Sequence, residues 1–410
     1  MTKKILALLL ALVLCLGLMA CAASTTTEPA KTEEKTEAAA SSTTEAAAET
    51  TEASGDPINV GFIAPLSGAN AAVGTSNQTG VEMAVEEINA AGGINGRPLK
   101  LFAYDDENDA SVAVSMCNKL IYNDNVCAII GSTNSSVTLG AMTITQDAGI
   151  PELTPNSSGA AITNSGYKYI IRVQLNDLKM AEACVKYAVE NCGYKKIALM
   201  YQDDDYGTGG MEVITDVMKG YNMELVACEA FDAASTDMSA QLVNVKAADP
   251  DCLIMWCMYT PGATIATQAR QLGIEAQFMG GGGLTNAKLY ELGGENVVGL
   301  INTQPFLAGA DAINDFSKAF IENYTAKYGK APDSNVGMAY DCVYTLKEGI
   351  QYALDTYNDL EGDHLMEGML AIKDVPMATG NMTCSPNGDL DREQMLLVRL
   401  NEDGSYSVVN

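Results

Sequence analysis

The chain has 410 residues, and its 52 acidic against 24 basic side chains give a formal net charge of −28. Such a surface repels nucleic-acid phosphates, and no cluster of lysine and arginine offsets it, so we expect no nucleic-acid partner. Hydrophobic residues make up 47% of the chain, as in a globular protein, and about 355 residues follow the N-terminal segment, more than one core usually organises. Two lobes are therefore expected.

The N-terminus has the composition of an export signal. Two lysines precede an apolar run that is too short to span a bilayer comfortably. The run ends in Leu18-Met19-Ala20-Cys21, which resembles the bacterial lipobox, where cleavage precedes a lipid-carrying cysteine. We predict a signal peptide over 1–20 and a lipid on Cys21. An ordinary signal peptide, cut near Ala20 or Ala23, is the alternative.

The segment that follows has no means of forming a core. Residues 22–55 contain no aromatic and no large aliphatic side chain, so burial cannot offset the entropy of ordering them. As a coil, this length has an end-to-end distance on the order of 30 Å. We therefore interpret 21–55 as a lipidated cysteine and a disordered linker that holds a folded part away from a membrane.

From Asp56 onward, short β-branched runs alternate with longer amphipathic stretches. The run 58–63 is typical of a strand, and the apolar spacing over 78–91 predicts a helix ended by a glycine pair. A strand, a helix and a strand are predicted over 99–104, 110–123 and 126–130. Such alternation indicates parallel strands covered by helices on both faces, with ligands bound at the carboxyl ends of the strands.

The same alternation restarts after a break. It predicts a strand over 167–173 that leads into a crossover, then a helix, a strand, a helix and a strand over 177–191, 196–201, 208–219 and 251–258. The segment 305–308 is expected to cross back, and helices over 313–328 and 337–355 would complete the first lobe. The expected fold class is α/β, with two doubly wound lobes.

Seven short motifs follow one another along 57–400. They are Val60 to Gly68, Asn89 to Leu99, Tyr104-Asp105-Asp106, Ile130-Gly131-Ser132, Asp205-Tyr206-Gly207, Gln268 to Ile274 and Ala339-Tyr340-Asp341. Together they resemble the Leu/Ile/Val-binding family of periplasmic receptors. Each motif is weak alone, but seven in this order and spacing are specific.

The resemblance implies a type I periplasmic-binding fold, in which two lobes joined by three hinge crossovers close over a ligand. Residues 57–176 and 305–390 would form lobe 1, and 177–304 with 391–410 would form lobe 2. Ligand binding would shift the population toward the closed form, which an ABC permease recognises. We therefore predict an extracytoplasmic solute-binding lipoprotein, anchored to the cell membrane through Cys21, that delivers a branched-chain or related amino acid to an ABC importer.

The resemblance also implies which residues bind the ligand. In this family, Ser/Thr-rich loops after the third and fourth strands bind the ligand carboxylate, and the matching segments are Asn134 to Ser136 and Thr154 to Ser158. The residues predicted to bind are Ser135, Ser136, Asn156, Ser157 and Ser158. Hydroxyls and backbone N–H groups at helix N-termini donate to an anion without a buried counter-charge. Serines at such positions also serve as ordinary helix caps.

The second lobe would contribute aromatic residues. The resemblance carries over Tyr206, in the acidic loop 203–207, and Tyr259, at the end of the strand 251–258. Trp256, the only tryptophan, is interpreted as a core residue. The acids of the 203–207 loop lack a glutamate at the twelfth position of a calcium loop, so we expect a solvated turn and no metal site.

Two positions depart from the family pattern. Gly282 stands where the family's amino-acid receptors hold the ligand ammonium with an acid, and Val73 where the branched-chain receptors place an aromatic cover. A buried ammonium without a carboxylate partner is costly. Either another acid, such as Asp205 or Asp341, supplies the charge, or the ligand is an amide, urea or small carboxylate. Asp341 is equally suited to pin its own helix.

Nothing in the sequence indicates an enzyme or a cofactor. His364, the only histidine, has no nucleophile setting nearby and is interpreted as a surface residue. The glycines of 280–283 lack the spacing of a nucleotide-binding motif. A ligand-sensing module that acts through a partner receptor is the remaining alternative, because this fold also serves in receptors.

Nine cysteines follow Cys21, an odd number scattered among mostly apolar neighbours. They form no CxxC pair and no zinc-like cluster. We interpret most of them as small buried hydrophobes.

Overall fold

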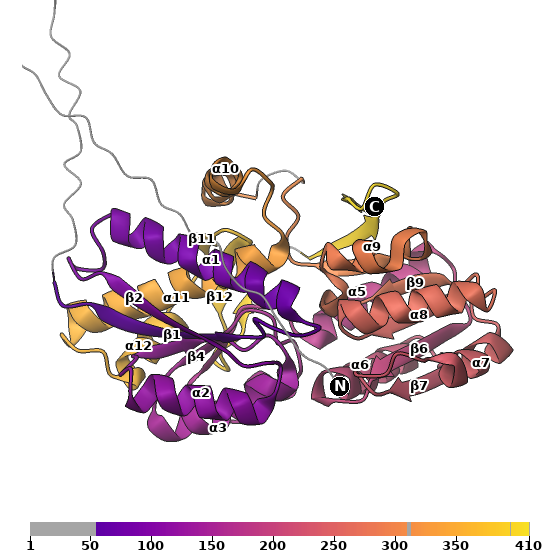
Figure 1. Cartoon of the computed structure of the whole chain (residues 1–410), viewed down its shortest axis with the longest axis horizontal. Helices are drawn as coiled ribbons and strands as arrows, with labels where there is room; N and C mark the ends of the chain where they lie inside the picture. Colours follow the sequence, from indigo (N-terminus) through magenta and orange to yellow (C-terminus); the bar gives the residue numbers. More distant parts are fainter. Residues whose placement is uncertain (1–54, 310–312, 394, 410) are drawn as a thin grey trace, which may run out of the picture. The chain divides into compact units, whose positions relative to one another are not determined.

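The computed structural model describes residues 55–309, 313–393 and 395–409 (Figure 1). The predicted signal peptide, the predicted lipidation site Cys21 and all but the last residue of the predicted linker lie outside these ranges. Within them, no helix combines the length and the apolar character that a membrane span requires.

The first sheet is parallel throughout, in the order β2-β1-β3-β4-β5. Its strands are β1 (Ile58–Ala64), β2 (Leu99–Asp105), β3 (Ala128–Ile130), β4 (Glu152–Thr154) and β5 (Ile170–Arg172). Helices α1 (Ala71–Ala90) and α11 (Ser334–Thr356) pack together on one face, and α2 (Ala110–Tyr122) and α3 (Ser135–Ala148) on the other (Figure 1). Because both faces are covered, the central strands β1 and β3 are mostly apolar, whereas the edge strand β2 carries Lys100 and Asp105.

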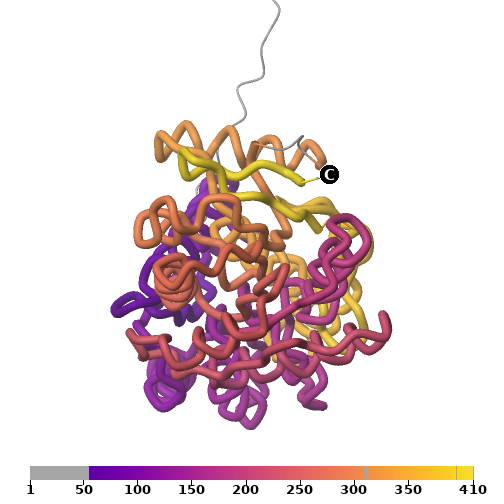
Figure 2. The backbone as a smooth tube through the Cα atoms, turned by 90° about the vertical axis from the view of Figure 1, so that its right-hand side faces the viewer, coloured from indigo at the N-terminus to yellow at the C-terminus, as the bar shows by residue number. Residues whose placement is uncertain are grey.

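The second sheet has the order β15-β14-β10-β9-β8-β6-β7. Its parallel strands are β6 (Ile197–Gln202), β7 (Ala227–Phe231), β8 (Cys252–Trp256), β9 (Gln277–Gly280) and β10 (Ile301–Gln304), and β14 (Leu396–Leu400) and β15 (Tyr406–Val408) extend it in antiparallel fashion (Figure 2). Its helices are α5 (Asp177–Lys186), α6 (Asp205–Gly220), α7 (Ser239–Ala248), α8 (Tyr259–Gln271) and α9 (Lys288–Gly293).

We use lobe 1 for the first sheet with its helices and lobe 2 for the second sheet with its helices. The chain passes between them after β5, after β10 and after β13. Lobe 1 also contains α4 (Ala161–Asn164), α10 (Asp315–Tyr328), α12 (Gly362–Leu370) and a small sheet of β11 (Val375–Met377), β12 (Gly380–Cys384) and β13 (Leu390–Asp391). This is the two-lobed α/β architecture that the sequence predicts.

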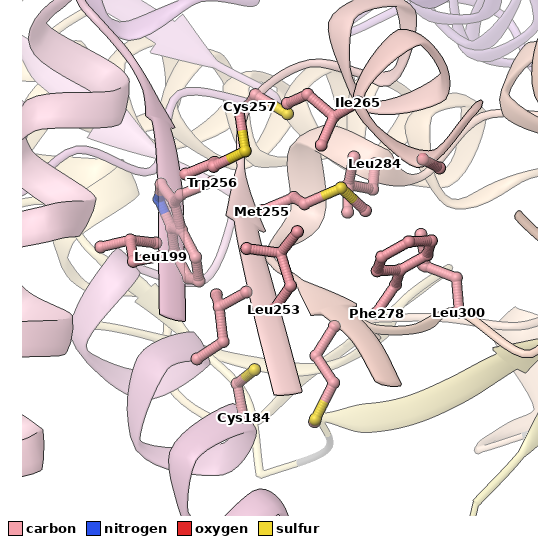
Figure 3. Packing of buried hydrophobic residues seen from close by; sticks show 14 of the residues in the cluster. Cys184, Leu199, Leu253, Met255, Trp256, Cys257, Ile265, Phe278, Leu284 and Leu300 are labelled. Atoms are coloured by element: carbon pink, nitrogen blue, oxygen red, sulfur yellow. The ribbon is translucent and has the colours of Figure 1, made fainter. Parts of the chain in front are cut away.

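The core of lobe 2 is built around β8, whose five residues are all buried (Figure 3). Trp256 is fully buried in it, as interpreted from the sequence. A Cβ at Gly210 would lie 2.1 Å from the indole, and one at Gly281 would lie 2.9 Å from it. Glycine at both positions therefore makes room for the tryptophan, which is a packing residue and not part of the pocket wall.

Helix α1 differs from its predicted range because tertiary packing outweighs propensity. It begins at Ala71, ahead of the predicted 78–91, and includes Gly74 and Gly80, which disfavour helix in isolation. A Cβ at Gly74 would lie 1.9 Å from the Pro65 carbonyl oxygen, and one at Gly80 would lie 2.3 Å from the Val336 carbonyl oxygen. The glycines thus allow α1 to pack directly against neighbouring backbone.

The cysteines agree with their interpretation as hydrophobes. Six of the nine described are buried, namely Cys117, Cys184, Cys252, Cys257, Cys342 and Cys384, and all nine are free thiols. Burial raises the pKa of the buried thiols, which keeps them protonated and unreactive.

A buried acid lies inside lobe 1. Glu152, on β4, has no exposed surface; its Oε2 accepts a hydrogen bond from Thr145 Oγ1 at 2.8 Å, and its Oε1 has no partner among the described residues. Burial raises the pKa of this carboxyl to about 8. Glu152 is therefore largely uncharged at neutral pH.

Replacing this acid should change how stability depends on pH. The folded pKa lies above the unfolded value, so the folded state binds more protons between pH 4.5 and about 8. The protein's free energy of unfolding therefore falls as pH rises through that window, by up to about 1.4 kcal/mol per pH unit. Glu152→Gln should remove this contribution. Urea unfolding of both proteins at pH 6, 7 and 8 measures it, and parallel pH profiles would contradict the assignment.

Candidate functional site

A pocket with about 400 Å³ of empty volume lies where the carboxyl ends of both sheets meet. It is lined by Val73, Thr133, Asn134, Ser135, Asn156, Ser158, Gln174, Tyr206, Met258, Gly282, Gly283 and Asn335. No side chain that carries a full charge at neutral pH lines it.

The N-terminus of α3 forms one wall. Asn134 caps the helix, because its Oδ1 accepts from the N–H of Ser136 at 2.9 Å. Ser135, the first helical residue, accepts at Oγ from the N–H of Gly159 at 3.2 Å, which leaves its hydroxyl proton free to donate. Free N–H groups at a helix N-terminus favour an anion.

The loop after β4 forms the adjoining wall. Asn156 and Ser158 line the pocket, whereas Ser157 points away from it. The Ser157 hydroxyl lies 2.8 Å from Thr138 Oγ1 on α3, so it fastens the loop to the helix.

Arg172, at the end of β5, holds this loop from behind. The side chain is 1% exposed and its Nη1 donates to the backbone carbonyls of Ser158 and Gly159 at 2.8 and 2.7 Å. Its Nε donates to Asp389 Oδ1 at 2.7 Å, and its Nη2 donates to Thr163 Oγ1 at 2.8 Å. The position of the Ser158 loop therefore depends on a buried guanidinium that does not line the pocket.

Lobe 2 closes the pocket with Tyr206, the second residue of α6. Its hydroxyl accepts from the N–H of Gly283 at 3.2 Å, and its ring centre lies 6.3 Å from that of Trp256. Burial raises the pKa of the Tyr206 hydroxyl well above its ordinary value. The hydroxyl therefore stays protonated and can donate to a bound solute.

The two lobes are in direct contact beside the pocket. The N–H of Asp205 donates to Ser136 Oγ at 3.1 Å. On another flank, the Tyr259 hydroxyl donates to the backbone carbonyl of Ala69 at 2.8 Å. The lobes are therefore closed in this structure.

The seven sequence-predicted ligand residues fall into three groups. Ser135, Asn156, Ser158 and Tyr206 line the pocket. Ser136 and Tyr259 make contacts between the lobes, and Ser157 supports the loop. The structure thus brings four of the seven predictions to the pocket.

Several pocket residues were not among the predictions. They are Thr133, Asn134, Gln174, Met258, Gly283 and Asn335. Thr133 and Asn134 directly precede the predicted Ser135, so the strand-end position was a usable signal. Gln174 lies in a crossover and Asn335 near the start of α11, and nothing local marks either of them. Val73 and Gly282, the two departures from the family pattern, both line the pocket.

Asp177, the first residue of α5, is a buried acid next to the pocket. It has no exposed surface, and neither carboxylate oxygen has a hydrogen-bond partner of normal geometry among the described residues. Burial raises the pKa of this carboxyl to about 6, although Ser158, Arg172 and Trp256 lie close enough to lower it. An unpaired buried carboxylate is costly, which identifies Asp177 as a candidate partner for a cation.

The two acids considered from the sequence are placed differently. Asp205 is exposed at the start of α6. Asp341 is buried in α11, where its carboxylate accepts from the backbone N–H groups of Ala378 and Thr379 at 2.7 and 3.0 Å. Asp341 therefore pins the turn between β11 and β12, and it does not line the pocket.

Within the described ranges, no group of three or more His, Cys, Asp or Glu side chains could hold a metal ion. His364 is a partly exposed residue of α12; its ring stacks on Tyr357 at 3.7 Å and its Nδ1 lies 2.7 Å from Asp359 Oδ1.

Comparison with known proteins places this geometry in context. Residues 57–405 match the family described as periplasmic binding protein. The leucine-, isoleucine-, valine-, threonine- and alanine-binding protein of Pseudomonas aeruginosa is 28% identical, over 86% of this chain and 92% of its own length.

Solved structures of similar proteins have the same fold. The leucine-binding protein of Thermotoga maritima is 26% identical, with a TM-score of 0.80 over 86% of this chain and 98% of its own. A branched-chain amino acid transporter substrate-binding protein of Streptococcus pneumoniae, solved with isoleucine, is 26% identical, with a TM-score of 0.78 over 86% of this chain and 99% of its own.

Removing the guanidinium behind the Ser158 loop should destabilise the fold strongly. Arg172→Ala removes the charge partner of Asp389 and one of the two donors to each of the Ser158 and Gly159 carbonyls, which keep only the backbone N–H groups of Asp177 and Ile162. Breaking such a buried pair costs about 3–5 kcal/mol. Urea unfolding measures the loss. Lys168→Ala is the matched control, because its ion pair with Asp363 is about half exposed and such pairs contribute under about 1 kcal/mol. Equal effects of the two substitutions would contradict the role assigned to Arg172.

Proposed function

This chain belongs to the periplasmic binding protein family, and we propose that it captures a branched-chain or related amino acid between its lobes and delivers it to an ABC importer. Membership of the family implies an extracytoplasmic location and a role in solute binding. The amino acids named for its relatives from Pseudomonas aeruginosa and Streptococcus pneumoniae support an amino-acid ligand. We propose that it acts by binding and lobe closure, without catalysis.

One observation carries the proposal: the pocket has hydroxyl donors at one wall and a fully buried, unpaired acid next to it. Ser135 and the N-terminus of α3 would hold the α-carboxylate. Asp177 would supply the counter-charge for the α-ammonium; its neighbour Ser158 lines the pocket. Asp177 would thus take the role of the acid that the family's amino-acid receptors carry at the position of Gly282.

The ligand would act by favouring the conformation in which the two lobes are closed. The solute would touch Ser135 and Asn156 from lobe 1 and Tyr206 from lobe 2, so it makes its full set of contacts only when the lobes meet. A ligand shifts a conformational equilibrium by its difference in affinity for the two states. The closed form would then be the species that the permease recognises.

A solute without an ammonium, such as an amide, urea or small carboxylate, is the second candidate. It is favoured by one observation, namely that no acid lines the pocket directly. A thermal shift with small amides but with no amino acid would establish it.

The role of Asp177 can be tested with two ligands that differ at one group. L-leucine carries an α-ammonium, whereas 2-hydroxy-4-methylpentanoate carries a hydroxyl in its place. Asp177→Asn should weaken leucine binding by at least tenfold, because it removes the charge partner, and should change hydroxy-acid binding much less. Calorimetry on protein that lacks 1–21 and is refolded free of carried-over ligand measures both. The exposed Asp205→Asn is the control.

The pH dependence of binding provides a second readout for the same residue. Because the pKa of Asp177 is about 6, the acid must lose its proton to pair with an ammonium below that pH. Leucine affinity should fall by up to about tenfold per pH unit below 6. A profile that is the same in Asp177→Asn would contradict the ion pair.

We also propose that a lipid on Cys21 holds the protein at the membrane. The lipobox-like sequence and the polar linker behind it support this. Cys21→Ala should move the protein from the membrane fraction to the soluble fraction and abolish labelling by a fatty-acid analogue. Cys15→Ala, inside the signal peptide, should leave both unchanged. Retention of Cys21→Ala in the membrane fraction would contradict lipidation.

A further inference from the structure

The pocket is bordered by a chain of three asparagine side chains. Asn77 Nδ2 donates to Asn156 Oδ1 at 2.5 Å, and Asn156 Nδ2 donates to Asn335 Oδ1 at 2.8 Å. Asn335 Nδ2 in turn donates to the backbone carbonyl of Thr285, in lobe 2, at 2.9 Å. We call Asn77, Asn156 and Asn335 the asparagine chain; its last two members line the pocket.

Two residues of the asparagine chain have N–H groups and a lone pair that the chain itself does not use. Each amide nitrogen carries two N–H groups, and the chain accounts for one on Asn156 and one on Asn335. The second N–H of each residue makes no hydrogen bond to a described residue. Asn335 Oδ1 accepts one hydrogen bond and has a second lone pair. This wall of the pocket therefore offers both donors and an acceptor.

Two further polar groups face the same space. Thr133 lines the pocket, and its buried Oγ1 has no partner among the described residues. Gln174 Oε1 accepts from the N–H of Leu175 at 2.9 Å, and its Nε2 lies 3.2 Å from where a Cβ at Gly282 would be. The amide of Gln174 thus lies in front of Gly282, and a Cβ at 282 would require this amide to shift slightly.

The charges around the pocket limit which side chains a bound solute can carry. No Lys or Arg lines it, while Asp177 and the partly buried Asp204 lie just outside it. A negative side chain would meet like charge without a cation. An aliphatic side chain would bury the spare donors and the Thr133 hydroxyl unpaired, which a site built to hydrogen-bond its solute strongly disfavours.

We propose that the bound amino acid carries an uncharged hydrogen-bonding side chain, a carboxamide or a hydroxyl, and that the protein discriminates against the aliphatic side chains of the same shape. A carboxamide presents one acceptor and two donors, which matches the mixed wall of Asn156, Asn335 and Thr133. The inference rests on the proposed amino-acid-binding function, since it concerns the side chain of the same solute.

The test uses pairs of amino acids with nearly equal shape. Threonine and valine form one pair, and asparagine and leucine form the other. On refolded protein that lacks 1–21, calorimetry and thermal shift should show the polar member of at least one pair binding tenfold or more tightly than its aliphatic counterpart. Equal binding, or tighter binding of valine and leucine, overturns the inference and leaves the proposed function standing. If no amino acid binds, both fail.

Matched variants test the wall itself. Thr133→Val replaces an unpartnered hydroxyl with a methyl group, so it should fold normally and reduce the preference for threonine over valine by several fold. Thr303→Val is the control, because Thr303 is also buried with an unpartnered hydroxyl but does not line the pocket. Equal preferences in wild type and Thr133→Val overturn the role of this wall, as does the same loss of preference in Thr303→Val.

Discussion

Two buried guanidinium groups at the crossovers determine where the pocket walls lie. Arg172 ends β5 and binds both the Ser158 loop and Asp389, next to β13. Arg392 follows β13 and donates to the Val173 carbonyl, just after β5, and to Thr379 Oγ1. The first and third crossovers are therefore tied to each other and to the ligand loop. Burying an arginine is costly unless its donors are used. Arg172 uses Nε, Nη1 and Nη2, whereas Arg392 Nε has no partner among the described residues.

The pocket and the contacts between the lobes use overlapping groups. Asn335 borders the pocket and also donates to Thr285 of lobe 2, and Asn134 borders it while its Nδ2 lies 3.4 Å from Asp204 Oδ2. Recognition of the solute and closure of the lobes are therefore physically coupled, because the same amide groups take part in both. This coupling needs no residue distant from the site.

Most of the fold could be predicted from the sequence, because alternating strand and helix patterns are local and strong. The start of α1 could not, since Gly74 and Gly80 are explained only by the backbone they pack against. In the site, strand ends and motif order indicated Ser135, Asn156, Ser158 and Tyr206. Asp177 looked like an ordinary acid in the first turn of a helix, and only its complete burial sets it apart. Gln174 and Asn335 reach the pocket through the way the lobes meet, which no local pattern encodes.

The direction of β1 has a mechanical consequence. Its carboxyl end leads toward the pocket, and Ile58, at its other end, lies six residues from Ala64, about 20 Å along the strand. A pull applied through the segment before Ile58 enters a strand that is bonded on both sides, by β2 and β3. Such a force would load lobe 1 alone. Lobe 2 and the three crossovers would carry none of it, so the protein could open and close while it is held from that end.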